Sequence, residues 1–318
     1  MGKQLRTCFQ FLEAPLVSLL PDGVDCVVRL HDPSRVLELD RCVFSLVSQE
    51  LQPVRILLVT QRFSLDDQHQ LLTGLQPLLA GSPQASLELL NYAAAEPADA
   101  RTALLNLGLT ACRQRYLGFL DYDDLLYPEA YRLLVDALRR SEATLAFAGI
   151  RVMEVDLQAG WVHTRRQRQA GFAGGGLVDL FSSNFCPIHS YLIDRQRLNP
   201  QDLWFDPELT IEEDYDLLLR LCARYSCDFS LIACTIGDYL FKSDGSNTIH
   251  AARPSQRPFD YEWVKAQLEV TRSTTTLAKQ VAEQLSLPNT SQAWTIRQAL
   301  DHLDFSQPPR QPQAQAGT

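Results

Sequence analysis

Residues 100–127 read ARTALLNLGLTACRQRYLGFLDYDDLLY, a stretch that joins a helix pattern, an apolar strand and an acidic turn. The strand at 116–120 runs directly into Asp121, Asp123 and Asp124. In open α/β sheets, ligands bind beyond the carboxyl ends of the strands. We therefore predict that these carboxylates face a ligand.

Short apolar runs alternate with amphipathic stretches on both sides of this motif. The alternation predicts strands joined by helices, and hence a mostly parallel sheet. The expected strands are 24–30, 54–60, 87–90, 116–120, 144–155 and 229–240. The expected helices are 33–47, 66–79, 101–112, one that starts near Pro128, 213–225, 259–285 and 291–303, and a polar, glycine-rich loop is expected at 167–176.

The composition along the chain divides it into four parts. An N-terminal extension covers 1–23, one α/β domain covers 24–250, and a helical extension covers 251–305. The tail at 306–318 is rich in Pro and Gln, so we expect it to be disordered.

The acidic composition excludes one class of partner. The chain has 318 residues, with 29 Lys and Arg against 38 Asp and Glu, and a net charge of −9. A protein that binds nucleic acid by neutralising phosphates is normally basic, so we expect no nucleic-acid partner. Hydrophobic residues make up 46% of the chain, which indicates a folded core rather than general disorder.

The apolar runs are too short for a transmembrane segment, which needs about 18–20 residues. Glu13 and Pro15 interrupt the N-terminal apolar segment, which therefore fits a secretory leader poorly. We expect a cytoplasmic protein. A basic patch of His163, Arg165, Arg166 and Arg168 leaves peripheral contact with an anionic membrane surface open, beside the simpler alternative of a solvated loop.

The acidic turn after the strand at 116–120 is typical of a site for a hard cation. Three carboxylates so close in sequence repel one another. Mg²⁺ or Mn²⁺ relieves that repulsion, and it usually binds one or two carboxylates together with phosphate oxygens of a substrate. A helix N-cap is the alternative, but it accounts for one Asp and not for three.

A second acidic cluster, Glu212-Glu213-Asp214, comes directly before an amphipathic helix. Carboxylates at a helix N-terminus stabilise the helix, so a purely structural role is one interpretation. A carboxylate at a cleft can instead act as a general base toward a substrate hydroxyl. The sequence leaves both interpretations open.

Four motifs follow one another along 24–250. The first is VVRLHDPSRVLELDRCVFSLVSQ at 27–49, and the second is the stretch at 100–127. The third is EDYDLLLRL at 213–221, and the fourth combines Tyr239 with 243–247. In this order they resemble motifs of family 2 glycosyltransferases of the GT-A fold: the first strand and helix; Arg-x-x-Ala-Leu-Asn-x-Gly, a strand and a D-x-D motif; a Glu-Asp-x-Asp block followed by Arg-Leu; and a closing Tyr…Gly-Ser-Asn segment.

The resemblance implies a GT-A fold, with a Rossmann-like, mostly parallel central sheet flanked by helices. It implies a metal-dependent, inverting enzyme that moves one sugar from a nucleotide-diphospho-sugar to a hydroxyl of a glycan, glycolipid or glycoprotein. A lipid-linked acceptor is included in this class. Mn²⁺ or Mg²⁺ is the implied cofactor.

The resemblance also assigns roles to single residues. Asp214 falls on the catalytic base, with Glu213 beside it, and Asp123 falls on the direct metal ligand, with Asp124 as a helper. Asp121 falls on the position that contacts the ribose and can share the metal. The remaining donor-binding positions are Arg29, His31 and Asp32 in the loop after the first strand, and Arg101 at the start of a helix.

One departure from the family pattern lies at the end of the second strand. The family usually has an acidic pair there, but this chain has Val59-Thr60-Gln61-Arg62. Gln61 is the candidate for a hydrogen bond to the nucleobase edge. The departure leaves an alternative function open, a catalytically inactive glycosyltransferase-like scaffold that binds a sugar nucleotide or a partner enzyme.

Overall fold

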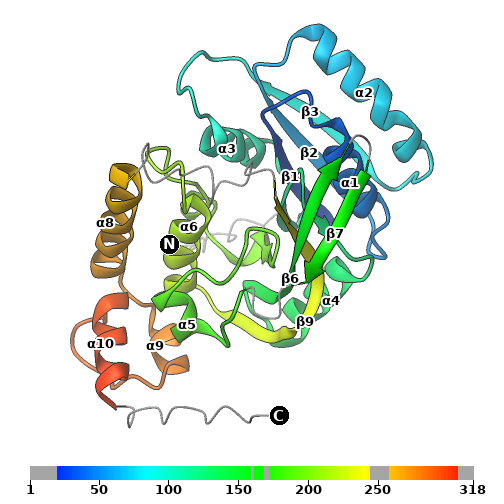
Figure 1. The fold of residues 1–318 in the computed structure, drawn as a ribbon. Helices are drawn as coiled ribbons and strands as arrows, with labels where there is room; N and C mark the ends of the chain where they lie inside the picture. The colour runs from blue at the N-terminus through cyan, green and yellow to red at the C-terminus, as the bar shows by residue number, and fades with distance from the viewer. Residues whose placement is uncertain (1–19, 159–160, 168–171, 244–257, 307–318) are drawn as a thin grey trace, which may run out of the picture.

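The first half of the protein forms a parallel sheet. The computed structural model describes residues 20–158, 161–167, 172–243 and 258–306 (Figure 1). Its first four strands lie in the order β3-β2-β1-β4, and all three neighbouring pairs are parallel. These strands are β1 (Val24–Leu30), β2 (Val54–Gln61), β3 (Ser86–Tyr92) and β4 (Tyr116–Asp121).

The second half extends the same sheet with mixed pairing. β4 continues into β8, β6, β9 and β5, and β7 pairs with the outer part of β6. Only β6 and β9 are parallel here, and the other pairs among these described strands are antiparallel. The bounds are β5 (Leu125–Leu126), β6 (Leu145–Gln158), β7 (Trp161–Gln167), β8 (Tyr191–Asp194) and β9 (Cys227–Lys242).

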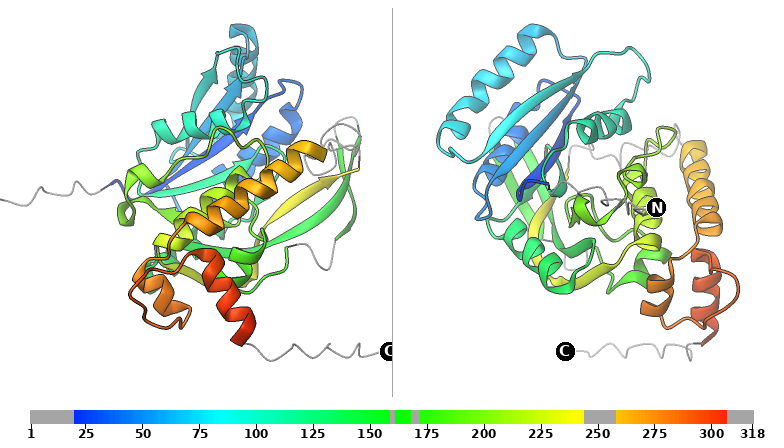
Figure 2. Two further views of the ribbon diagram at one scale, coloured as in Figure 1. Left: turned by 90° about the vertical axis from the view of Figure 1, so that its left-hand side faces the viewer. Right: turned by 180° about the vertical axis from the view of Figure 1, so that it is seen from behind.

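Helices cover both faces of the sheet, because successive strand residues point to opposite faces and apolar side chains lie on both. Val28 packs in one core cluster and Val27 in the other. The Val28 side carries α1 (Val36–Val47), α2 (Leu65–Ala80) and α4 (Ala130–Ser141). The Val27 side carries α3 (Arg101–Ala111), α5 (Leu177–Ser182), α6 (Glu213–Arg224), α8 (Pro258–Thr274), α9 (Lys279–Gln284) and α10 (Ile296–Ser306), and two short 3₁₀ turns lie at Arg195–Arg197 and Pro200–Asp202. Figure 2 shows α8 to α10 at the end of the molecule away from α2.

Two side chains explain why α3 lies where it does. The Asn106 amide makes two hydrogen bonds with the backbone of Phe205, at 2.8 Å and 2.9 Å. Gly108 faces β1 so closely that a Cβ atom there would lie 2.5 Å from Val27 Cγ1. The Asn-x-Gly part of the motif therefore fixes α3 against β1 and the loop before α6, and places Arg101 at the carboxyl end of the strands.

The structure confirms the α/β fold class and most of the expected elements. The single helix expected at 259–285 is wrong: α8 and α9 are separate, because Thr276 leaves the helix to bridge Thr295. The sequence patterns also missed β5, β7, β8 and α5, which are short or exposed. The expected tail from 307 onward, residues 168–171 of the expected loop and 244–247 of the closing motif lie outside the described residues.

Within the part of the chain that the structure describes, no helix is long and apolar enough to cross a membrane.

Candidate functional site

Arg29 joins the two acidic motifs at the carboxyl end of the sheet. It is paired in register with Asp121 on the neighbouring strand. Arg29 Nε donates to Asp121 Oδ1 at 2.7 Å, and Arg29 Nη1 donates to Glu213 Oε1 at 2.5 Å. One guanidinium therefore holds the end of β4 against the N-terminus of α6. Burial by itself would raise the pKa of Asp121, but the Arg29 charge and hydrogen bond hold that pKa below its usual value.

Asp123 has a different cationic partner, which the sequence motifs did not include. Lys242 Nζ, from the last residue of β9, donates to Asp123 Oδ2 at 2.6 Å. The Lys242 side chain is 2% exposed and that of Asp123 is 20% exposed. Burial raises the pKa of Asp123 above its usual value, although Lys242 opposes this shift. A signal for Lys242 existed in the sequence, since it is a cation at the end of an apolar strand.

Asp124 is directed into the protein rather than toward the other two carboxylates. Its Oδ1 accepts the backbone N–H of Leu240 at 2.8 Å, and its Oδ2 lies 3.5 Å from His189 Nδ1. Burial, followed by the charges of Asp123 and Asp121, raises the pKa of Asp124 well above its usual value. Asp124 thus ties the acidic turn to β9.

Asp214 is the second residue of α6 and lies partly exposed beside buried Glu213. Partial burial of the carboxyl, followed by the charges of Glu213 and Glu212, raises the pKa of Asp214 well above its usual value. Its Oδ1 accepts the Tyr215 N–H at 2.8 Å, and it forms no ion pair with any residue that the structure describes. Glu213 is neutralised by Arg29, so Asp214 is the carboxylate of this pair that can accept a proton.

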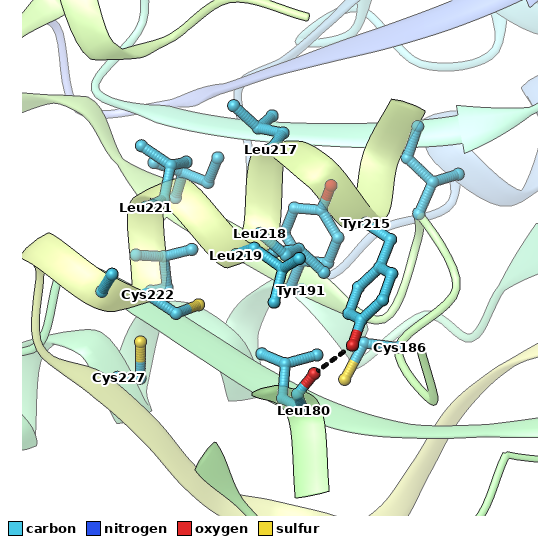
Figure 3. Packing of buried hydrophobic residues seen from close by; sticks show 14 of the residues in the cluster. Leu180, Cys186, Tyr191, Tyr215, Leu217, Leu218, Leu219, Leu221, Cys222 and Cys227 are labelled. Carbon is cyan, nitrogen blue, oxygen red and sulfur yellow. Dashed lines mark hydrogen bonds between the residues drawn. The ribbon is translucent and has the colours of Figure 1, made fainter. Parts of the chain in front are cut away.

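The position of Asp214 depends on how α6 is packed. The helix buries a continuous apolar side, with Tyr215 OH donating to Leu180 O at 2.7 Å (Figure 3). Helix α8 holds the same turn from outside, because Arg272 Nη2 donates to Tyr215 OH at 2.8 Å and Thr271 Oγ1 donates to Asp216 Oδ1 at 2.7 Å. The C-terminal helices therefore support the first turn of α6, which carries the acidic cluster.

The predicted donor-binding loop lies beside the acidic turn. The His31 ring meets Tyr122 edge to face, with 5.8 Å between ring centroids. Burial, followed by the Arg101 charge, lowers the pKa of His31. Arg101 also acts on Asp121, whose pKa it lowers. Asp32 accepts the N–H and the Oγ–H of Ser34 at 2.9 Å and 2.7 Å, so it shapes this loop.

Gln61 and Arg62 both contact the loop that leads to α3. Gln61 Nε2 donates to Ala98 O at 2.9 Å, and Gln61 Oε1 accepts the Ala100 N–H at 3.3 Å. Arg62 donates to the carbonyl oxygens of Ala94, Pro97 and Ala98. Gln61 and Arg62, where the resemblance implies an acidic pair, therefore hold the 94–100 loop through its backbone.

The structure brings most of the predicted site residues together. Arg29 contacts both Asp121 and Glu213, and the electrostatic effects on Asp121, Asp123 and Asp214 link Arg101, Asp123 and Asp214 to the same cluster. Asp124 lies behind this cluster, and Gln61 is engaged by the backbone. The described residues contain no group of three or more metal-ligating side chains.

A comparison with protein families gives one match. The family described as glycosyl transferase family 2 matches residues 35–198, which is half of the chain and includes the acidic turn after β4. No curated protein matches the chain.

Solved structures show a similar fold. The chain aligns with S. aureus TarS 1-349 with a TM-score of 0.57 and 13% identity, over 89% of this chain and 72% of that one. TarS 1-349 in complex with UDP aligns with a TM-score of 0.55 and 12% identity, over 82% and 69%. TarS 1-349 in complex with UDP-GlcNAc aligns with a TM-score of 0.56 and 13% identity, over 82% of this chain and 70% of that one. At these identities the similarity establishes the GT-A fold.

Proposed function

Because the chain belongs to glycosyl transferase family 2 and is a glycosyltransferase, we propose that it moves one sugar, with inversion, from a nucleotide-diphospho-sugar to an acceptor hydroxyl. The observation that carries this proposal is the Arg29 bridge. It joins Asp121, in the expected donor motif, to Glu213, beside the expected base. This contact supports one common site for donor and acceptor chemistry. A glycan or a lipid-linked saccharide is the acceptor class that we propose.

Asp214 is the proposed general base. It takes the proton from the acceptor hydroxyl as the hydroxyl oxygen attacks the anomeric carbon and the bond to the diphosphate breaks. Its raised pKa makes it a stronger base than an ordinary aspartate. Since no described cation is paired with Asp214, its proton-accepting oxygen is not already committed. Glu213 has the supporting role of holding Arg29.

Asp123 and Asp121 would hold the Mn²⁺ or Mg²⁺. Their carboxylate oxygens are the ligands that hard cations prefer, and both side chains reach the surface, with 20% and 28% exposed. Two protein carboxylates suit this cofactor, because such ions usually complete their shell with phosphate oxygens and water. The ion would supply positive charge at the leaving diphosphate. Asp124 holds the turn against β9 and so keeps Asp123 in position.

The remaining donor contacts follow from the loop geometry. Arg101 supplies a guanidinium near Asp121, which suits a phosphate or ribose oxygen. The lowered pKa of His31 keeps its ring neutral near pH 7, so it can donate a hydrogen bond without adding charge. Gln61 and Arg62 hold the 94–100 loop, and its backbone would contact the nucleobase in place of an acidic side chain.

Donor turnover with a panel of nucleotide sugars tests this function. UDP-GlcNAc is the first candidate because TarS structures hold UDP and UDP-GlcNAc. The full chain with Mn²⁺ should release nucleoside diphosphate from at least one donor, and Asp214→Asn should reduce the rate. Asp136→Asn, on the exposed side of α4, is the matched control and should leave the rate unchanged. Nucleotide binding without release for any donor would instead favour the scaffold function.

A further inference from the structure

Lys242, the last residue of β9, contacts the acidic turn and has almost no access to water. Its ammonium donates to Asp123 Oδ2 at 2.6 Å and lies 5.5 Å from the centroid of the Tyr122 ring. The side chain is 2% exposed. A buried ammonium is stable only with anionic or polar partners, so Lys242 cannot leave Asp123 for solvent at low cost.

This geometry disfavours the binding of a cation to Asp123 when no nucleotide is bound. A divalent ion on Asp123 would lie next to the Lys242 ammonium, and the two positive charges repel each other. The repulsion is strong because burial prevents Lys242 from moving into water. The metal ligand of the proposed function is thus already neutralised by the protein itself.

We propose that Lys242 is a diphosphate-binding residue that exchanges Asp123 for the donor's phosphate oxygens, so that metal and nucleoside diphosphate bind cooperatively. This inference rests on the proposed function. A diphosphate is the ligand class that resolves the conflict, because its oxygens give the ammonium a new anionic partner beside the acidic turn. Asp123 is then released for the metal, and the metal and the diphosphate attract each other. Lys242 therefore makes metal binding depend on donor binding.

Neutral variants at position 242 test the exchange. Lys242→Gln removes the charge while its amide can still donate to Asp123, and Lys242→Met is a second neutral variant. Lys265→Gln is the matched control, since it removes one positive charge from an exposed lysine on α8. Free Mn²⁺ would be followed by electron paramagnetic resonance without nucleotide, and UDP binding by calorimetry in Mn²⁺ or EDTA, using the full chain in each case.

The inference predicts opposite effects on the two ligands. Lys242→Gln should bind Mn²⁺ alone on the order of 10-fold more tightly than the wild type, and UDP in EDTA more weakly. The factor by which Mn²⁺ strengthens UDP binding should fall by a similar amount. Lys265→Gln should behave as the wild type in every titration.

Three results would overturn the inference. One is an unchanged Mn²⁺ affinity in Lys242→Gln, and another is an unchanged UDP affinity in EDTA. The third result needs no variant, and it is that the wild type binds UDP with the same affinity in Mn²⁺ as in EDTA. If the wild type binds none of UDP, GDP and dTDP, the proposed function fails instead. The titration with Mn²⁺ alone still tests the role of Lys242, because it compares the Mn²⁺ affinity of Lys242→Gln with that of Lys265→Gln.

Discussion

Arg29 Nη1 lies 2.5 Å from Glu213 Oε1, although the two residues are 184 positions apart in the sequence. The same guanidinium contacts Asp121, so one side chain on β1 supports both acidic motifs. Glu213 is only 5% exposed, and without Arg29 its charge would be buried and unpaired.

Arg29→Met should therefore destabilise the protein strongly. Removing one partner of a buried ion pair costs about 3 kcal/mol or more. Urea denaturation followed by circular dichroism measures this loss. Arg132→Met, which removes an exposed arginine paired with Glu50, should cost less than about 1 kcal/mol. Equal losses in the two variants would contradict the structural role of Arg29.

Asp214→Asn should separate activity from stability. Loss of a general base lowers the rate by about 10²- to 10⁴-fold. The raised pKa means that the folded state holds the Asp214 proton more tightly than the unfolded state does. Folding stability from this group is therefore present at low pH and is lost as the pH rises from about 4 through the raised pKa.

The stability of Asp214→Asn at pH 8 should thus equal or exceed that of the wild type, since the variant has no charge to bury. Denaturation at pH 8 and steady-state kinetics on the same preparation would check both parts. A variant that is inactive and also less stable would indicate that Asp214 mainly supports α6. The wild-type rate should fall on acidification, because the base must be deprotonated.

His189 should make the protein sensitive to acid. Burial lowers the pKa of His189 to about 4, and the ring stacks against Tyr239 with an interplanar angle of 7°. The contribution of neutral His189 to the free energy of unfolding is present above about pH 6.5. It is lost as the pH falls toward 4, which lowers the free energy of unfolding by up to about 3 kcal/mol. His189→Phe keeps a ring but cannot be protonated. Its unfolding free energy should depend less on pH over this range, and an identical pH profile would contradict the assignment.

Gly108 should be intolerant of a methyl group. Its Cβ would lie 2.5 Å from Val27 Cγ1 and 3.3 Å from Val59 Cγ2, so Gly108→Ala should cost about 1–3 kcal/mol through overpacking. Gly74→Ala is the matched control, because a Cβ atom at this position of α2 would have no atom within 4 Å apart from its own helix backbone. This second variant should gain about 0.5–1 kcal/mol from helix propensity. Thermal unfolding of both proteins gives the comparison.

Local patterns were sufficient for the parallel half of the fold. β1 and β2 are apolar and rich in branched residues, so both faces of these strands had to be covered by helices. The pattern over 259–285 predicts one helix where the structure has two, because a local pattern does not reveal that Thr276 pairs with Thr295. β5 and β8 were missed for the same reason, since short strands are stabilised by partners distant in sequence.

The sequence by itself determined which residues could bear the chemistry, because three carboxylates after a buried strand and three before a helix are local patterns. Only the tertiary structure decided which of these carboxylates are paired with a cation. Arg29 forms ion pairs with Asp121 and Glu213, and Lys242 forms one with Asp123. Asp214 forms no ion pair with any residue that the structure describes. Electrostatic partners come from whichever strand ends and helix termini the fold brings within a few ångströms, and sequence spacing does not encode those distances.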